Sequence, residues 1–207
     1  MQNFRLALGV IGCLFLMGCN SGPRAVPLPD VNASKAAAAA IEQYDRNGDG
    51  QLAKEEWSAS PALAAVADRY DTSKDGVLSA GEISEGIGAW QQGGMGLRAV
   101  PFTVRFNEQP LAGATVRLVP APFLGGAIKE AVGETSQGGT GRLDIRPEDK
   151  PSDAPKMALM QPGLYHVEIT HPTKKIPAKY NTATTLGIEI TSSNPDPKGI
   201  VWSLNSK

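Results

Sequence analysis

The sequence predicts a two-domain α + β protein, in which a small helical domain is followed by a seven-stranded β-sandwich. Two observations support this prediction. Between residues 32 and 92, apolar residues recur at helical spacing around two similar loops. After Val100, short alternating apolar and polar runs are separated by Gly, Pro and Asn. The glycine-rich residues 93–98 lie between the two patterns, and 207 residues are enough for two domains with separate cores.

The first 18 residues are predicted to be an export signal. A short polar start containing Arg5 is followed by a mostly apolar run from Leu6 to Met17. This run is too short to span a bilayer core of about 30 Å. It ends in Leu-Met-Gly-Cys, which resembles the bacterial lipobox, a sequence whose Cys is lipidated and becomes the new N-terminus.

The lipobox resemblance implies that Cys19 carries a lipid and holds the protein on a bacterial membrane, in the periplasm or at the cell surface. The alternative is an ordinary secretory signal that is cut nearby, and the protein is exported in both cases. Cys13 is lost with the signal, so the mature chain is predicted to lack a disulfide. The formal net charge is −1, so nucleic acid is not a predicted partner.

The predicted organisation has five parts. Proline-rich residues before the helical region are expected to form a tether between the lipid and the folded protein. The parts are a signal peptide at 1–18, a lipid-anchored tether at 19–31, the helical domain at 32–92, a linker at 93–98 and the β-sandwich at 99–207.

Two twelve-residue stretches repeat the same order of oxygen-bearing residues. They run from Asp45 to Glu56 and from Asp71 to Glu82. Each has short oxygen-bearing side chains at positions 1, 3 and 5, Gly at position 6, Leu at position 8 and Glu at position 12. Ca²⁺ binds about 6–8 oxygens at about 2.3–2.6 Å, and alternate short side chains in a tight loop supply most of them. The sequence therefore predicts two calcium sites.

Each predicted site uses four side chains and one backbone carbonyl. The ligands are Asp45, Asn47, Asp49, the Gln51 carbonyl and Glu56 in the first loop, and Asp71, Ser73, Asp75, the Val77 carbonyl and Glu82 in the second. Gly50 and Gly76 are expected to adopt positive φ at the sharp turn of each loop. Leu52 and Leu78 at position 8 are expected to pair between the loops. With three acidic ligands per loop, we expect modest affinity, suited to the calcium-rich conditions outside a cell.

Helices are predicted on both sides of each loop. The Ala-rich run Ala33–Tyr44, capped by Asn32 or Ser34, leads into the first loop. Residues 60–70 begin with a Ser-Pro pair, which is typical of a cap and first helical turn, and lead into the second loop. Ile83, Ile87 and Trp90 lie at helical spacing in the last helix. The short interval between the loops leaves room for only a very short helix after the first.

Together, the loops and their flanks resemble the EF-hand family in a compact paired form. That resemblance implies two helix-loop-helix units with one bound Ca²⁺ each.

The second half is predicted to contain about seven strands. Each has apolar residues on one face and polar residues on the other, as a half-buried strand requires. They centre on residues 102–106, 116–118, 131–135, 143–145, 165–169, 188–190 and 200–204.

Four stretches in this half resemble the carboxypeptidase regulatory-like, or transthyretin-like, domain of secreted and lipid-anchored bacterial proteins. They are Gln109–Pro120, Gly133–Ile145, Pro162–Ile169 and Ile176–Asn181. The resemblance implies an immunoglobulin-like Greek-key sandwich of about seven strands.

No catalytic residues are predicted, so the protein is not expected to be an enzyme. The sequence contains no zinc-binding H-x-x-E or H-E-x-x-H motif, no G-x-S-x-G turn and no phosphate loop. His166 and His171 are expected to be surface or loop residues, since their odd spacing would put them on opposite faces of a strand.

The leading functional prediction is an exported calcium-binding lipoprotein with a structural or protein-interaction role at the cell envelope. Two alternatives remain open. In the first, the sandwich binds a peptide or glycan partner while calcium only stiffens the spacer. In the second, the protein is a small hydrolase or an accessory subunit of an envelope enzyme.

Overall fold

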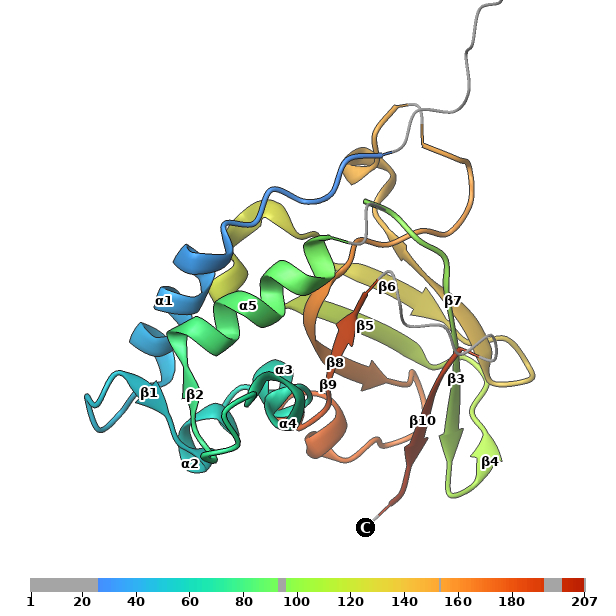
Figure 1. The fold of residues 1–207 in the computed structure, drawn as a ribbon. Coiled ribbons are helices and arrows are strands. Elements are labelled where there is room, and N and C mark those ends of the chain that lie inside the picture. The colour runs from blue at the N-terminus through green and yellow to red at the C-terminus, as the bar shows by residue number, and fades with distance from the viewer. Residues whose placement is uncertain (1–25, 93–95, 153, 192–198, 207) are drawn as a thin grey trace, which may run out of the picture.

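The computed structural model describes residues 26–92, 96–152, 154–191 and 199–206. The predicted signal at 1–18, the predicted lipidation site Cys19 and part of the predicted linker at 93–98 lie outside the described residues. The described chain is a mixed α + β fold, in which a group of helices packs beside a curled β-sheet (Figure 1). Within these ranges, no helix is both long enough and apolar enough to cross a membrane.

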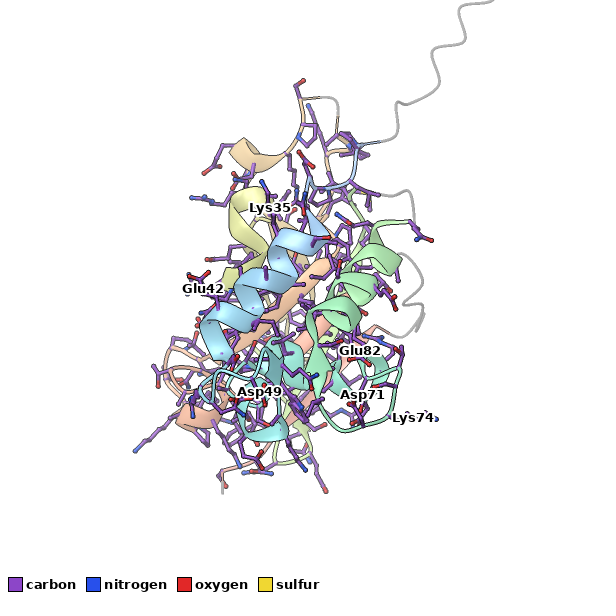
Figure 2. The ribbon with its side chains drawn as sticks, turned by 60° about the vertical axis from the view of Figure 1, so that its left-hand side comes forward. Lys35, Glu42, Asp49, Asp71, Lys74 and Glu82 are labelled. Atoms are coloured by element: carbon purple, nitrogen blue, oxygen red, sulfur yellow. The ribbon has the colours of Figure 1, made fainter. Side chains whose placement is uncertain are left out.

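The helices of the first half lie where the apolar spacing predicts them. They are α1 (Ala33–Tyr44), α2 (Lys54–Trp57), α3 (Pro61–Ala64), α4 (Ala67–Tyr70) and α5 (Ala80–Gln91). The side chain of Asn32 caps α1 by accepting a hydrogen bond of 2.9 Å from the backbone N–H of Lys35. The two longest helices, α1 and α5, pack side by side (Figure 2). The short α2 confirms the prediction of a very short first exit helix.

The helix predicted over residues 60–70 is divided into α3 and α4. Between them Val66 has φ −123° and ψ −6°, which is outside the helical region. Val66 is buried, and a β-branched residue has little preference for a helical backbone. The break lets α3 pack on the sheet while α4 leads into the second loop.

The seven predicted strands are all present. They are β3 (Val100–Phe106), β5 (Thr115–Pro120), β6 (Ala131–Glu134), β7 (Thr140–Ile145), β8 (Gly163–Thr170), β9 (Gly187–Ile190) and β10 (Ile200–Leu204). A further short strand, β4 (Gln109–Pro110), pairs with β3. The sheet order is β10-β3-β7-β6-β5-β8-β9, and every neighbouring pair is antiparallel except β10 with β3, which is parallel. Three 3-10 segments complete the fold: η1 (Pro122–Ala127), η2 (Pro147–Asp149) and η3 (Ala178–Tyr180).

One hydrophobic core runs through the helices and the sheet. It includes Leu63 and Ile87 from the helices and Leu118 and Val167 from the strands, all of them fully buried. Helix α3 packs on β8 and β9, and α1 packs on η1. The predicted linker at 93–98 therefore separates two patterns in the sequence, while the segments on its two sides share their apolar interior.

Residues 26–31, which were predicted to belong to the tether, lie against the folded protein. The backbone N–H of Gly96 donates to the carbonyl oxygen of Val26 at 3.1 Å, and Nε2 of Gln91 donates to the carbonyl oxygen of Val31 at 2.6 Å. Pro29 and Val31 are buried. The folded body therefore begins earlier in the chain than the sequence predicts, because the backbone of this proline-rich segment is hydrogen bonded to Gln91 of α5 and to Gly96.

Candidate metal centre

In the first loop, two carboxylates bring the ends of the loop together. Asp45, at position 1, accepts hydrogen bonds from the backbone N–H groups of Gly48 (2.6 Å) and Gly50 (2.9 Å). Glu56, at position 12, accepts from the N–H groups of Asn47 (3.2 Å) and Ala53 (2.8 Å). Glu56 is only 5% exposed. The predicted closing ligand is therefore folded back onto the start of the loop by the loop's own backbone.

The side chains at positions 3 and 5 of the first loop interact with each other. Nδ2 of Asn47 donates to Oδ2 of Asp49 at 2.9 Å, and the backbone N–H of Asp49 donates to Oδ1 of Asn47 at 2.9 Å. Oδ1 of Asp49 accepts from the N–H of Gln51 at 2.9 Å. Because a carboxylate oxygen has two lone pairs, these bonds leave acceptor capacity on each carboxylate.

The second loop repeats this pattern with its own residues. Asp71 accepts from the N–H of Gly76 at 2.9 Å, as Asp45 does from Gly50. Glu82 accepts from the N–H groups of Ser73 (3.1 Å) and Ser79 (3.0 Å), which occupy the same loop positions as the partners of Glu56. Two further contacts complete this loop: Oγ of Ser73 donates to Asp71 at 3.2 Å, and the N–H of Val77 donates to Asp75 at 3.1 Å.

Two local predictions about the loops are confirmed. Gly50 has φ +81° and Gly76 has φ +86°, so both adopt the left-handed conformation expected at position 6. Leu52 and Leu78 are directly opposite in the antiparallel pair formed by β1 (Gln51–Leu52) and β2 (Leu78–Ser79). Both leucines are fully buried, so the pairing of the two loops is stabilised by apolar contact as well as by backbone hydrogen bonds.

Backbone donors stabilise the ionised form of carboxylates in both loops. The pKa of Asp45 is lowered, mainly by the hydrogen bond from the N–H of Gly50. Burial is the largest single influence on Glu82 and raises its pKa. The hydrogen bonds from Ser79 and Ser73 together outweigh it, and they lower the pKa to about 2. Both groups are therefore negatively charged at neutral pH.

The donor set is chemically suited to a hard cation. Every predicted ligand atom is an oxygen, from carboxylate, amide, hydroxyl or backbone carbonyl, which is the set that Ca²⁺ prefers. Asp49 and Asp71 extend from the two loops at the same end of the molecule (Figure 2). In the part of the chain that the structure describes, however, no three or more Asp, Glu, His or Cys side chains are grouped as a metal ion requires. Binding would therefore require the side chains within each loop to move closer together.

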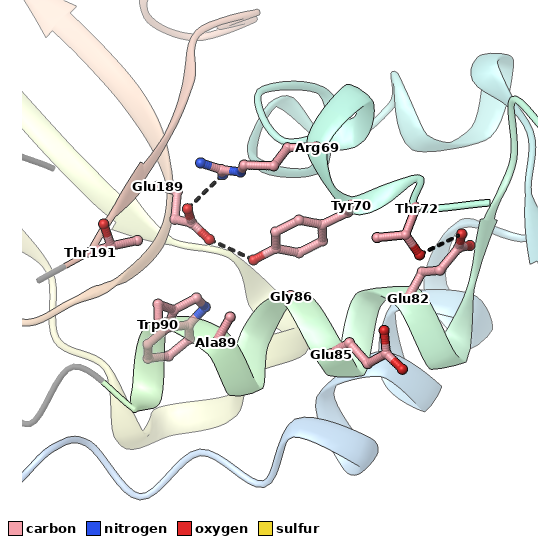
Figure 3. A pocket seen from close by; sticks show the side chains of 10 residues that line it. All are labelled: Arg69, Tyr70, Thr72, Glu82, Glu85, Gly86, Ala89, Trp90, Glu189 and Thr191. Carbon is pink, nitrogen blue, oxygen red and sulfur yellow. Dashed lines mark hydrogen bonds and ion pairs between the residues drawn. The ribbon is translucent and has the colours of Figure 1, made fainter. Parts of the chain in front are cut away.

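A polar contact joins the second loop to the sheet (Figure 3). Tyr70 immediately precedes the ligand Asp71, and its hydroxyl donates to Oε1 of Glu189 on β9 at 2.6 Å. Nη2 of Arg69 lies 2.5 Å from the other oxygen of the same carboxylate. The ring of Tyr70 rests against Gly86 of α5, where an added Cβ would lie 2.3 Å from the ring. These residues line a cavity of about 360 Å³ between α4, α5 and β9.

The role of Glu189 was not predicted from the sequence. In the run Ile188-Glu189-Ile190 the alternation suggests that Glu189 faces solvent, yet its side chain is only 6% exposed, because α3 packs on β9 and Arg69 and Tyr70 of α4 contact Glu189. Burial raises the pKa of Glu189, while the hydrogen bond from Tyr70 and the charge of Arg69 oppose that rise. Burial also raises the pKa of Tyr70, which therefore stays a neutral donor at physiological pH.

Glu189 should make stability depend on pH. Its pKa in the folded protein is raised above the ordinary 4.5, so the folded state binds this proton more tightly than the unfolded state. The tighter proton binding adds to the free energy of unfolding. This contribution is fully present at low pH and is lost as the pH rises through the pKa of Glu189 in the folded protein. We therefore expect the wild type to exceed Glu189→Gln in free energy of unfolding by more at pH 4 than at pH 7. Urea titrations of both proteins at the two pH values test this, and the opposite ordering would contradict it.

The two histidines do not form a site together. His171 lies in the loop after β8, where Nε2 is 2.9 Å from the carbonyl oxygen of Ala112 and Nδ1 accepts from the N–H of Lys174 at 2.9 Å. His166 is half-buried on β8 rather than on the surface. Its Nε2 is buried with no hydrogen-bond partner in the structure, and burial lowers its pKa. The expectation of a surface position is wrong for His166 because α3 covers this part of the sheet.

No protein-family model, curated protein or solved structure matches this chain. The resemblances to the EF-hand and carboxypeptidase regulatory-like families therefore stay predictions.

Proposed function

We propose that this protein is an exported, lipid-anchored calcium-binding protein with a structural or protein-interaction role at the cell envelope. The observation that carries the proposal is the equivalence of the two loops. In each, the position-1 carboxylate accepts from the position-6 glycine, and the position-12 carboxylate accepts from the backbone at positions 3 and 9. Such a repeat places the same oxygens twice, which favours two sites of one kind.

The two halves of the chain would have different roles. The helical half is proposed to be an EF-hand pair, supported by the short pairing of Leu52 with Leu78 between its loops. The curled sheet is proposed to be an immunoglobulin-like sandwich, supported by its seven strands in predominantly antiparallel order. No reaction is proposed for either half.

The proposed mechanism is metal-coupled ordering of the loops. When bound, Ca²⁺ would supply the positive charge that balances the clustered carboxylates. The chain's own contribution is to hold Asp45 ionised and to orient Asp71 through backbone donors, and to keep Glu56 and Glu82 turned toward the start of each loop. Because Tyr70 adjoins Asp71 and binds Glu189, order in the second loop would extend to the sheet.

Calorimetric titration of the full mature chain with Ca²⁺ tests this function. We expect two sites in the wild type and one site in each of Glu56→Gln and Glu82→Gln, because each change removes the charge of a closing ligand. Glu42→Gln is the matched control, since Glu42 is an exposed carboxylate on α1 outside both loops (Figure 2). The proposal is wrong if millimolar Ca²⁺ produces no binding heat in a folded wild type, or if Glu42→Gln weakens binding as much as the loop variants do.

A further inference from the structure

The start of the described chain has a well-defined place on the folded body. Val26 and Pro27 lie beside Gly96, where an added Cβ would lie 1.8 Å from the carbonyl oxygen of Pro27. Two residues further along, Arg98 pairs with Met160 through two backbone hydrogen bonds of 2.9 Å each. The start of the described chain, residues 96–98 and the segment 157–160 therefore meet at one end of the molecule, which we call the anchor-side end (Figure 1).

The two candidate calcium loops lie at the opposite end. Helix α1 leads from the anchor-side end into the first loop, and α5 leads back from the second loop to Gln91, which binds the carbonyl of Val31. Each helix has 12 residues, so each separates the loops from the anchor-side end by about 18 Å. Figures 1 and 2 agree on this arrangement, since in both views the start of the described chain lies near the top and the loops lie beyond the far ends of α1 and α5.

Little chain is left to separate the body from a lipid on Cys19. Residues 20–25 are the only link between Cys19 and Val26, and even a fully extended chain spans at most about 3.6 Å per residue. Val26 therefore has to stay within about 25 Å of the lipidated residue. With residues 26–31 fixed to the body, this short link favours one orientation on the membrane.

The anchor-side end exposes residues that suit a lipid surface. In the segment before Met160, Lys156 is exposed and Met157 is 47% exposed. Among the described residues, few other large apolar side chains are exposed. This segment is held in place, because Nζ of Lys150 donates to the carbonyl oxygen of Met157 at 2.9 Å. An apolar side chain beside a lysine matches the boundary between acyl chains and anionic headgroups.

From this placement we propose that the anchor-side end, with Lys156 and Met157, lies against an anionic lipid bilayer and that the two calcium loops face away from it. The inference rests on the proposed lipidation of Cys19. It adds a fixed orientation, which leaves the loops and the C-terminal end of β10 open to the aqueous side (Figure 1).

Fluorescence quenching on vesicles tests this orientation. The full lipidated protein would carry one labelled cysteine, at Met157→Cys or at Ser58→Cys. Ser58 is an exposed residue after α2, near the loops. Since Cys13 is lost with the signal and Cys19 is acylated, each variant has a single free thiol. On phosphatidylethanolamine–phosphatidylglycerol vesicles with nitroxide headgroups, we expect loss of fluorescence for Met157→Cys and none for Ser58→Cys.

A wrong orientation and an absent lipid on Cys19 would give different results. Mass spectrometry and vesicle flotation report the lipid on Cys19 independently of the label. If the lipid is present and the protein floats, but Ser58→Cys is quenched as much as Met157→Cys, the orientation is wrong and the anchor stands. If no acyl mass is found, the anchor is absent and the orientation is overturned with it.

Discussion

Calcium is expected to raise the melting temperature of the full chain by about 10 °C or more, and Asp45→Ala combined with Asp71→Ala is expected to abolish the shift. A ligand that binds only the folded state stabilises it according to its concentration relative to Kd. For sites with Kd of about 10⁻⁴ M, 10 mM Ca²⁺ would add about 2.7 kcal/mol per site. In a chain of this size, each kcal/mol raises the melting temperature by about 2–4 °C.

The charges in the loops explain why Ca²⁺ should raise the melting temperature so much. The carboxylates of Asp45 and Asp71 accept hydrogen bonds from backbone N–H groups, and among the described residues neither forms an ion pair with a Lys or Arg side chain. Their negative charges are therefore clustered with those of Asp49, Glu56, Asp75 and Glu82 in two short loops, where like charges repel.

Scanning calorimetry or circular dichroism with and without 10 mM Ca²⁺ would measure the shift. Mg²⁺ at the same concentration is the control for ionic strength, and Glu42→Ala is the control for loss of a carboxylate elsewhere on the helical part. An unchanged melting temperature of the wild type in millimolar Ca²⁺ would rule out metal-coupled ordering.

Gly187→Ala is expected to lower the free energy of unfolding by about 3 kcal/mol, at the upper end of what overpacking usually costs. A Cβ at this position on β9 would lie 1.7 Å from the carbonyl oxygen of Pro61 and 2.3 Å from its carbonyl carbon. These are backbone atoms at the start of α3, so no side-chain rotation can relieve the clash. The helix would have to move away from β8 and β9, which would open the core shared by the two halves.

Gly88→Ala is the matched control for this experiment. Gly88 lies within α5, and a Cβ there would have no atom within 4 Å outside its own helix and immediate neighbours. The change should stabilise the protein by up to about 1 kcal/mol, because Ala favours a helix over Gly. Urea unfolding would compare the two variants with the wild type. Equal stability of Gly187→Ala and the wild type would mean that α3 does not pack on β9 in solution.

Much of the local structure could be predicted because its causes lie within a few residues of sequence. Asn32 caps α1, Gly50 and Gly76 adopt positive φ, and Leu52 pairs with Leu78, all as their positions in the pattern require. Each depends on short-range spacing or on the conformational freedom of one residue type. The seven strands were predictable for the same reason, since alternation of apolar and polar residues reports one buried face.

The features that could not be predicted depend on which elements meet. Alternation places Glu189 on the face of β9 away from the strand core, but it does not show that α3 packs on β9 or that Arg69 and Tyr70 of α4 contact Glu189. The parallel pairing of β10 with β3 joins residues nearly a hundred positions apart, and no local pattern encodes that register. The break at Val66 likewise follows from packing, because helical spacing alone predicts a continuous helix through it.

By itself the sequence determined the two acidic loops, their glycine turns and the order of helices and strands, because these follow from residue type and spacing. Only the tertiary structure decided that Glu189 holds Tyr70 beside the second loop, that Gly187 must have no side chain, and that residues 26–31 pack on the body at the end far from the loops. The physical reason is that these features depend on close packing between segments distant in sequence, where a single methyl group or hydrogen bond changes the free energy.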